Sequence, residues 1–153
     1  MNDLDCIFCK IVSKEIPVKL LVETDLCIGF LDAFPLTKGH TLIIPKNHYE
    51  KIQDLPADVN SEIFSTMHKL ISKVDSLTGA TLVAIHNGKD SGQEIPHVHI
   101  HLIPRSKDDS AGAVHSMFTK KPELSKSEFD DYVINCSLSS KEIFFDHYLN
   151  HRQ

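Results

Sequence analysis

The stretch PHVHIHLIPR, from Pro96 to Arg105, alternates imidazole and apolar side chains over its first half. Successive side chains of a β-strand point to opposite faces of the sheet. His97, His99 and His101 are therefore predicted to share one face, while the β-branched residues between them enter the core. The stretch thus predicts a strand that carries a functional surface on one side.

Hydrophobic periodicity extends the prediction outward from this strand. Apolar, β-rich runs bounded by turn residues indicate further strands at residues 19–23, 26–32, 40–46 and 80–87. Apolar positions recur at helical spacing from residue 58 to 78, and a short helix is expected near the N-terminus, after the first cysteines. Most connections are short, so the strands are expected to pair antiparallel with the long helix across one face. The expected fold class is α+β, with a five-stranded antiparallel sheet.

The composition is that of an ordinary globular domain. The chain has 153 residues, of which 41% are hydrophobic and 24% are charged, and its net charge is −5. The negative charge argues against nucleic-acid partners, and no apolar run is long enough to span a membrane. The N-terminus, MNDLDCIFCK, is acidic and lacks the apolar core of a secretory signal. We therefore expect a cytoplasmic protein.

Two of the four cysteines, Cys6 and Cys9, have the Cys-x-x-Cys spacing that is typical of zinc sites and of redox motifs. The redox motif follows a strand, and only five residues precede Cys6. Zinc needs two more ligands, for which neutral imidazoles are suitable. His48, just after a predicted strand, and His97 are the expected partners in one closed, structural zinc site per chain. The alternative for His48 is a surface position in a polar turn.

On that assignment, His99 and His101 remain available beside a loop that contains Gly88 and Gly92. A neutral imidazole can attack phosphorus and form a covalent intermediate, while a second one holds or delivers a proton near neutral pH. Glycines let backbone N–H groups approach anionic oxygens. The arrangement favours phosphoryl chemistry. Two alternatives stay open: a solvated strand face, and one metal bound by all three strand histidines.

The same stretches resemble the histidine triad (HIT) family. HVHIHLIPR resembles its signature, NGKDSGQEIP its phosphate loop, and FLDAFPLTKGHTLIIPKNH its nucleoside-binding and central strands. The resemblance covers roughly residues 5–105, and the leading CIFCKI resembles the Hint branch, close to bacterial members that carry zinc through a Cys-x-x-Cys.

The resemblance implies a HIT-like fold for residues 1–105 and leaves residues 106–153 as a C-terminal extension. The extension is expected to contain loop and helices and to pack on the same domain. Ser125 or Ser127, with Glu128 nearby, predicts a capped helix, and residues 140–153 are expected to form another.

Individual residues also match roles in the family. His99 matches the nucleophile, His101 a phosphate-contacting partner that assists the attack, and His40 a further histidine beside the nucleophile. Asp32 matches the carboxylate that binds the ribose hydroxyls. The remaining matches are the α-phosphate cradle (Asn87, Gly92, Gln93) and the apolar walls around the base (Phe8, Ile11, Phe30, Leu31). Glu94 departs from the Ser or Thr of many relatives, which leaves the leaving-group preference open.

The resemblance therefore implies a hydrolase or transferase that acts on purine nucleoside monophosphate esters or phosphoramidates through a nucleotidyl-His99 intermediate. A dinucleoside polyphosphate hydrolase, a nucleotide-binding adaptor protein with weak catalysis and a catalytic-zinc hydrolase are the alternatives. The resemblance also implies a homodimer.

Overall fold

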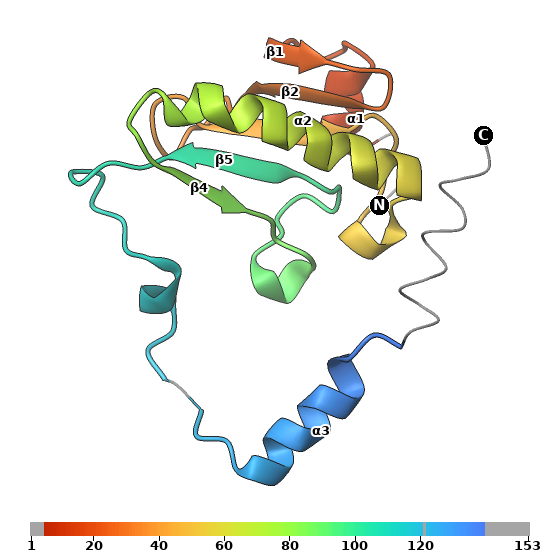
Figure 1. Cartoon of the computed structure of the whole chain (residues 1–153). Coiled ribbons are helices and arrows are strands. Elements are labelled where there is room, and N and C mark those ends of the chain that lie inside the picture. The colour runs from red at the N-terminus through yellow and green to blue at the C-terminus, as the bar shows by residue number, and fades with distance from the viewer. Residues whose placement is uncertain (1–4, 121, 140–153) are drawn as a thin grey trace. The chain divides into compact units, whose positions relative to one another are not determined.

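The computed structural model describes residues 5–120 and 122–139 of the chain (Figure 1). The chain divides into two compact units, Met1–Ser110 and Ala111–Gln153. The first unit carries the sheet, and this division falls shortly after residue 105, where the sequence predicts that the triad domain ends. The packing of the extension on that domain stays a prediction.

The sheet is antiparallel throughout, in the order β1-β2-β3-β5-β4. Its strands are β1 (Lys19–Glu23), β2 (Cys27–Leu31), β3 (Thr41–Pro45), β4 (Thr81–Ala84) and β5 (Ile100–Pro104). The last strand in sequence lies inside the sheet, between β3 and β4, and is paired on both sides. The predicted α+β class and the five antiparallel strands are confirmed.

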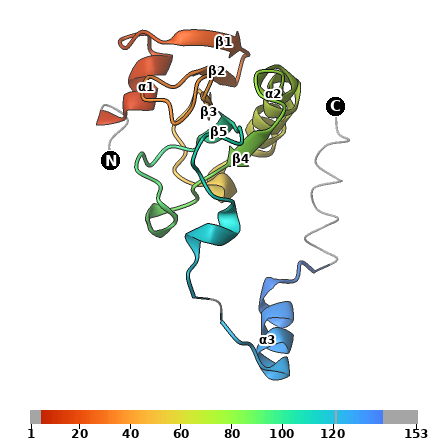
Figure 2. The same ribbon diagram turned by 90° about the vertical axis from the view of Figure 1, so that its left-hand side faces the viewer.

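Two helices cover opposite faces of this sheet, as Figure 2 shows. The short helix α1 (Ile7–Val12) lies on one face, and the long helix α2 (Ala57–Asp75) turns its buried stripe to the other. The second helix ends before the predicted Thr78. Gly79 has a left-handed φ of +85°, and its N–H bonds the carbonyl of Asp75 at 2.7 Å, which closes the last turn.

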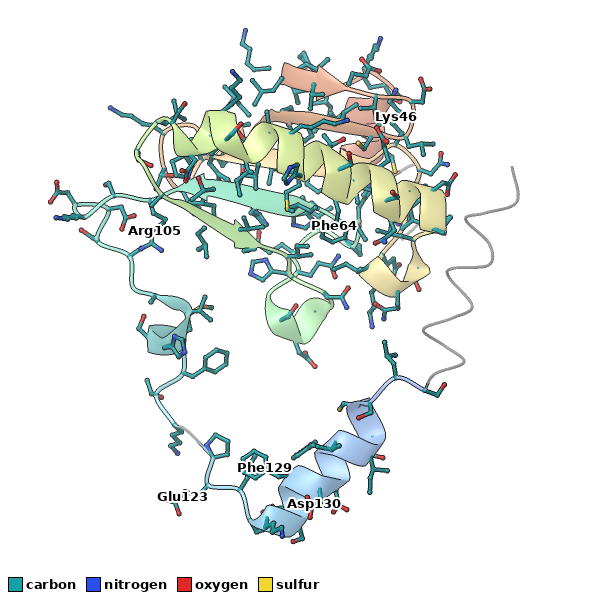
Figure 3. The ribbon with its side chains drawn as sticks, in the orientation of Figure 1. Lys46, Phe64, Arg105, Glu123, Phe129 and Asp130 are labelled. Carbon is teal, nitrogen blue, oxygen red and sulfur yellow. The ribbon has the colours of Figure 1, made fainter. Side chains whose placement is uncertain are left out.

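Each face of the sheet has its own core. The α1 face buries Cys6, Phe8, Ile11, Ile28, Phe30, Leu42 and Ile44, and the α2 face buries Ile43, Ile63, Val74, Val98, Ile100 and Leu102. Phe64, labelled in Figure 3, packs from α2 against the second core. Every residue of β3 is buried, because alternate side chains enter the two cores. Polar side chains on such inner strands need partners, since an unpaired buried polar group is costly.

The histidine stretch joins the sheet later than predicted. Strand pairing begins at Ile100, and the N–H of Val98 bonds a loop carbonyl rather than a neighbouring strand. The alternation of faces nevertheless holds. Val98 and Ile100 lie in the α2 core, while the rings of His97 and His99 both contact Phe8 of α1.

The second unit contains the helix α3 (Lys126–Cys136), which has no buried residue. Ser125 is its N-cap: the Ser125 hydroxyl accepts the N–H of Glu128, and the Glu128 carboxylate accepts the N–H of Ser125. This is the predicted capping box. Phe129 lies on the first turns of this helix (Figure 3). The helix expected over residues 140–153 lies outside the described residues. In the described part of the chain, no helix has the length and apolar character needed to cross a bilayer.

Candidate functional site

Four predicted metal ligands converge beside α1. Their sulfur and nitrogen atoms lie within 4.8 Å of one another, and the residues are Cys6, Cys9, His48 and His97. Nδ1 of His97 lies 3.5 Å from the sulfur of Cys6 and 3.7 Å from that of Cys9, which is itself 3.4 Å from Nδ1 of His48. A tetrahedral zinc site has ligand–ligand edges of about 3.3–3.8 Å. The group therefore has the dimensions of a site that could hold a metal ion.

Hydrogen bonding determines which nitrogen of His97 faces the sulfurs. Nε2 of His97 donates to the carbonyl of Pro45 at 3.0 Å, so Nδ1 keeps its lone pair and points at the cysteines. The side chains of His97 and Cys6 are buried. Two sulfurs and two imidazole nitrogens in a closed pocket suit a structural ion, with no position left open for substrate.

Two local features bring these ligands together. Cys6 is the N-cap residue of α1 and Cys9 lies one turn later, so their side chains meet on one side of the helix. His48 follows β3 and His97 precedes β5, and these two strands are neighbours in the sheet. The cluster joins the N-terminal segment to residues about 90 positions away, the Cys6–His97 pair being separated by 91.

The predicted nucleophile His99 is held in one orientation. Its Nδ1 donates to the carbonyl of His97 at 2.7 Å, which leaves the lone pair on Nε2. The residue is 5% exposed, and its ring meets Phe8 in an edge-to-face contact with centroids 5.2 Å apart. Burial lowers the pKa of His99, and the hydrogen bond to His97 opposes this shift. His99 is therefore a neutral imidazole near pH 7, with its lone pair on Nε2.

A chain of polar groups leads from Asp32 to His101. Nδ1 of His101 lies 2.9 Å from Nε2 of His40, and Nδ1 of His40 lies 3.3 Å from the Asp32 carboxylate. Burial, followed by the imidazoles of His99 and His40, lowers the pKa of His101 to about 4. Nε2 of His101 is buried without a hydrogen-bond partner among the described residues. A buried polar atom in this condition is one that a bound ligand would satisfy.

The proton on His40 has two competing neighbours. Nδ1 of His40 lies 3.2 Å from the N–H of Leu36 and also faces Asp32, so it either accepts from the amide or donates to the carboxylate. Burial lowers the pKa of His40, and the Asp32 charge opposes that shift. The other oxygen of Asp32 accepts the N–H of Phe34 at 2.9 Å. A ligand that binds Asp32 would therefore change whether Nδ1 of His40 accepts a hydrogen bond or donates one.

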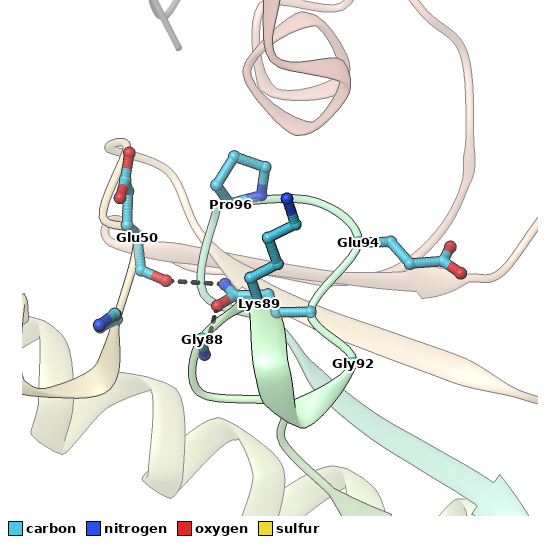
Figure 4. A pocket seen from close by; sticks show the side chains of 8 residues that line it. Glu50, Gly88, Lys89, Gly92, Glu94 and Pro96 are labelled. Carbon is cyan, nitrogen blue, oxygen red and sulfur yellow. Dashed lines mark hydrogen bonds between the residues drawn. The ribbon is translucent and has the colours of Figure 1, made fainter.

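The predicted phosphate loop is held in shape by one of its own side chains. Gly88 and Gly92 have φ of +114° and +95°, which residues with a Cβ rarely adopt. The Gln93 side chain accepts the N–H of Gly88 and donates to the carbonyl of Glu50, each at 2.7 Å (Figure 4). The loop borders a hollow of about 770 Å³.

A second amide side chain also holds this loop. Asn87 accepts the N–H of Ile52 and donates to the side chain of Gln53. Both amides that the resemblance assigns to the phosphate cradle, those of Asn87 and Gln93, are thus engaged with the segment around residue 52. Glu94 is exposed and, in Figure 4, points away from the bonds around Gly88. Contact of these side chains with phosphate stays a prediction.

Three of the four apolar residues expected around the base lie together. Phe8, Ile11 and Phe30 are buried in the α1 core, and Phe8 also contacts His99. Leu31 is 36% exposed and lines a different hollow, beside α2. Neighbouring residues of a strand point to opposite faces, so Phe30 and Leu31 cannot line one wall. Leu31 is the predicted site residue that the structure places on the other side of the sheet.

The structure adds one imidazole that the sequence motifs do not include. His86 follows β4, and its ring centroid lies 5.5 Å from that of His101. Because Ala84 pairs with His101, the alternation along β4 places residue 86 on the histidine face. Aligning ATLVAIHN antiparallel to HVHIHLIPR is the sequence signal that could have found it.

The alternative of one metal bound by all three strand histidines finds no support in this geometry. Of the three strand histidines, only His97 belongs to the cluster of metal-ligating atoms found in the described residues. His99 turns Nδ1 to a backbone carbonyl, and His101 turns Nδ1 to His40. The histidine stretch therefore serves two different groups.

Comparisons with known proteins agree with this architecture. A family model described as the HIT domain matches residues 13–108. Adenosine 5'-monophosphoramidase of Saccharomyces cerevisiae is 40% identical over 114 residues, which are 73% of this chain and 69% of the relative. A solved HIT family structure from Bacillus subtilis has a TM-score of 0.76 at 29% identity, covering 89% of this chain and 99% of that one. A Zn-bound histidine triad family protein from Mycobacterium smegmatis has a TM-score of 0.63 at 30% identity, covering 80% and 86%.

The matched region includes all five strands, the phosphate loop and the three histidines of the signature. Cys6 and Cys9 lie just before it. The predicted resemblance is confirmed: the chain belongs to the histidine triad family and is a hydrolase of that type.

Proposed function

We propose that the protein transfers the nucleoside monophosphate of a purine phosphoramidate or ester to Nε2 of His99 and then to water. The observation that carries this proposal is the 2.7 Å hydrogen bond from Nδ1 of His99 to the carbonyl of His97. It leaves a neutral imidazole with its lone pair on Nε2, in a ring 4.8 Å from that of His101. The yeast relative named as an adenosine 5'-monophosphoramidase supports the substrate class.

In the first step, Nε2 of His99 bonds to the α-phosphorus while the bond from phosphorus to the leaving amine breaks. The amine keeps the bonding electron pair and takes a proton from Nε2 of His101. For this step His40 carries a proton on each nitrogen, with Nδ1 facing the Asp32 carboxylate at 3.3 Å, and it passes the Nε2 proton to Nδ1 of His101 across 2.9 Å, so both rings end the step neutral. Amines are suitable leaving groups here because they become good ones once protonated.

In the second step, water bonds to phosphorus and the bond to Nε2 of His99 breaks, which restores the neutral imidazole. The water proton returns to the chain of His101 and His40. The products are a nucleoside monophosphate and an amine, and the enzyme regains its initial protonation.

Substrate binding is proposed to use the two sides of this centre. Asp32 accepts hydrogen bonds from the ribose hydroxyls, and Phe8, Ile11 and Phe30 supply the apolar side for the base. Glu94, exposed beside the phosphate loop, favours a cationic leaving group over a further phosphate, because a carboxylate repels phosphate. This disfavours dinucleoside polyphosphates as substrates.

Zinc is the metal we propose for the cluster of cysteines and histidines. The two sulfurs and two imidazole nitrogens of the cluster are a donor set that zinc prefers, and the related M. smegmatis protein is described as Zn-bound. The ion would fix the N-terminal segment against the sheet. His97 links this centre to the chemistry, since its ring faces the sulfurs and its carbonyl orients His99.

A rapid-quench experiment tests the covalent step. Adenosine phosphoramidate is mixed with excess enzyme, quenched at mildly alkaline pH and examined by intact-protein mass spectrometry. We expect a protein heavier by one adenosine monophosphate group, an adduct that acid removes and that His99→Ala fails to form. An adduct that persists in His99→Ala contradicts the assignment of the nucleophile.

A substrate panel separates the rival functions. Adenosine phosphoramidate should be hydrolysed faster than diadenosine polyphosphates, and the reverse order would favour the polyphosphate hydrolase. An adaptor protein would bind nucleotide with negligible turnover on either substrate. A catalytic-zinc hydrolase would form no adduct, and its activity would fall in proportion to metal removed by a chelator.

Two further proposals concern the state of the protein in the cell. The family resemblance supports a homodimer, which light scattering of the full chain would test. Thiols placed as metal ligands, rather than as disulfide partners, support a reducing, cytoplasmic location. Fractionation of the source cells would test it.

A further inference from the structure

A second hollow, beside α2, is not used by the proposed chemistry. It lies on the α2 face of the sheet, opposite the strand histidines, and has a volume of about 740 Å³, a size typical of small-molecule sites. One wall is a stripe formed by Leu70, Val74 and Leu77, on α2 and just after its end. The other wall includes Leu21 of β1 and Leu31 of β2. The hollow is therefore bounded by the second half of α2 and by the first strands of the sheet.

The walls of this hollow are apolar and open to solvent. Leu21, Leu31 and Leu77 are 46%, 36% and 59% exposed. Thr41, the buried polar residue of the lining, donates its hydroxyl to the carbonyl of Gly39 at 3.0 Å, so this hydroxyl is already satisfied. Covering the leucines with an apolar group is favourable, because it removes their surface from water.

Two lysines supply the charge in the lining. Lys38 and Lys73 line the hollow, no carboxylate does, and neither ammonium group forms an ion pair within the described part of the chain. Positive charge without acidic neighbours contrasts with the net charge of −5 of the whole chain. An apolar hollow with two ammonium groups complements a ligand that has an apolar tail and an anionic head.

The size of the hollow favours an alkyl chain over a peptide helix. From Leu70 to Leu77 the stripe is about 10 Å long, at about 1.5 Å per residue, which matches a tail of about eight carbons. Two turns of a peptide helix, with a width of about 10–12 Å, would occupy about 850 Å³ or more. That exceeds the volume of about 740 Å³ between the walls.

The hollow lies directly behind the polar chain that leads to His101. Leu31 of β2 pairs with Thr41 of β3, and both line the hollow. At the next position of the same two segments, the N–H of Asp32 bonds the carbonyl of His40 at 2.9 Å. Neighbouring strand positions face opposite sides, so the side chains of Asp32 and His40 lie back to back with those of Leu31 and Thr41. A ligand that displaces the second pair acts on the first.

We propose that this hollow binds a free medium-chain fatty carboxylate, with its tail along α2 and its carboxylate at Lys38 and Lys73, and that its occupancy shifts the Asp32–His40 pair. The site stands apart from the proposed chemistry, and its failure would leave that chemistry intact.

Calorimetry with octanoate and 1-octanol tests the binding site. The proteins are wild type, the double variant Lys38→Gln with Lys73→Gln, Leu77→Ser, and the control Lys69→Gln, which removes an exposed ammonium group of α2 outside the lining. The double lysine variant should weaken octanoate about fivefold, as expected for two surface charges, and leave octanol unchanged. Leu77→Ser should weaken both ligands alike, because it removes apolar wall. The control should match wild type.

Three results would overturn the binding site. Octanoate that does not bind wild type at millimolar concentration removes it. Octanoate that binds the double lysine variant as well as wild type removes the role of the charges. If an acidic amphipathic peptide, or vesicles of anionic lipid, bind with the same lysine dependence while free octanoate does not, the surface serves a protein or a membrane instead. All three lysines are exposed, so their variants should fold even if Leu77→Ser does not.

Amide spectra of ¹⁵N-labelled wild type test the link to the opposite face. Octanoate should move the resonances of Leu31 and Thr41, which line the hollow, and those of Asp32 and His40 behind them. The amide of Asp5, before α1, should stay in place. Movement of Leu31 and Thr41 without Asp32 and His40 would contradict the coupling.

Discussion

The proposed metal centre and the proposed catalytic group each take an imidazole from the same short stretch, and each presents a different nitrogen. In the metal centre, Nε2 of His97 is bonded to the carbonyl of Pro45, so Nδ1 faces the sulfurs. In the proposed catalytic group, Nδ1 of His99 is bonded to the carbonyl of His97, so Nε2 keeps its lone pair. On the proposed roles, the same side chain serves as a ligand or as a nucleophile according to which nitrogen a backbone carbonyl holds.

The two groups also differ in what their atoms face. In the proposed metal centre, the four ligating atoms lie within 4.8 Å of one another. In the catalytic group, Nε2 of His101 is buried without a partner in the described part of the chain. A closed set of donors suits structure, whereas an unsatisfied atom beside a nucleophile suits transient binding of a reacting group.

The largest effect should follow from removing the nucleophile. His99→Ala should lower kcat for a nucleoside phosphoramidate by about 10⁴-fold or more, because no second group forms the covalent bond. Metal content, measured by mass spectrometry of the elements, should match wild type. His97→Ala should instead lose bound metal, because the substitution removes a ligand. It keeps the backbone carbonyl that orients His99. Loss of metal in His99→Ala would mean that the two groups are not separate.

Breaking the metal centre should affect stability more than chemistry. Cys9→Ser should release about one zinc per chain and lower Tm by about 10 °C, while part of the activity remains. Calorimetry and metal analysis provide the measurement, and Cys136→Ser on α3 is the matched control, since this exposed cysteine lies outside the cluster. A metal-free wild type, with Tm unchanged in Cys9→Ser, would contradict the structural role.

The pH dependence of the free energy of unfolding should test the buried, neutral state of His101, a property of the proposed catalytic group. Burial and neighbouring imidazoles lower the pKa of His101 from 6.5 to about 4, so the unfolded chain binds a proton in this range that the folded protein does not. The contribution of His101 to the free energy of unfolding therefore keeps its whole value above pH 6.5 and is lost as the pH drops toward 4. His101→Gln should remove up to about 3 kcal/mol of that loss, measured by urea unfolding at several pH values. Parallel curves for wild type and variant would contradict the neutral, buried state of His101.

The smallest effect is expected at the edge of the catalytic group. Asp32→Ala should raise KM about tenfold and change kcat less, because binding of the ribose is similar in the ground and transition states. Steady-state kinetics with adenosine phosphoramidate measure both constants. A larger change in kcat than in KM would place the action of Asp32 on the proton of His40, which it approaches at 3.3 Å.

The fold and the composition of the metal cluster could be predicted because their signals are local. Alternation in HVHIHLIPR, helical spacing before Gly79 and the Cys6-x-x-Cys9 pair each reflect the geometry of a few successive residues. These patterns led to the sheet, the long helix and two of the four converging ligands. His48 and His97 followed from the ligand number of zinc.

What the sequence did not predict depends on pairing across the sheet and on side-chain bonds within loops. His86 joins the site through the register of β4 against β5, and no local pattern states that register. Leu31 was expected beside Phe30, although adjacent strand positions face apart. The amides of Asn87 and Gln93 turn toward the segment around residue 52, a choice that depends on where that segment lies.

The distance along the chain between Cys6 and His97 has a consequence for how the protein is made. The two residues are 91 positions apart, so the N-terminal segment leaves the ribosome long before its last ligand does. At a synthesis rate of roughly 5–20 residues per second, Phe8 and both thiols of the nascent chain wait roughly 5–20 seconds for β5. A segment made well before β5 is thus among the last to settle, and a nascent chain that stops short of His97 lacks both the fourth ligand of the proposed metal centre and the proposed nucleophile.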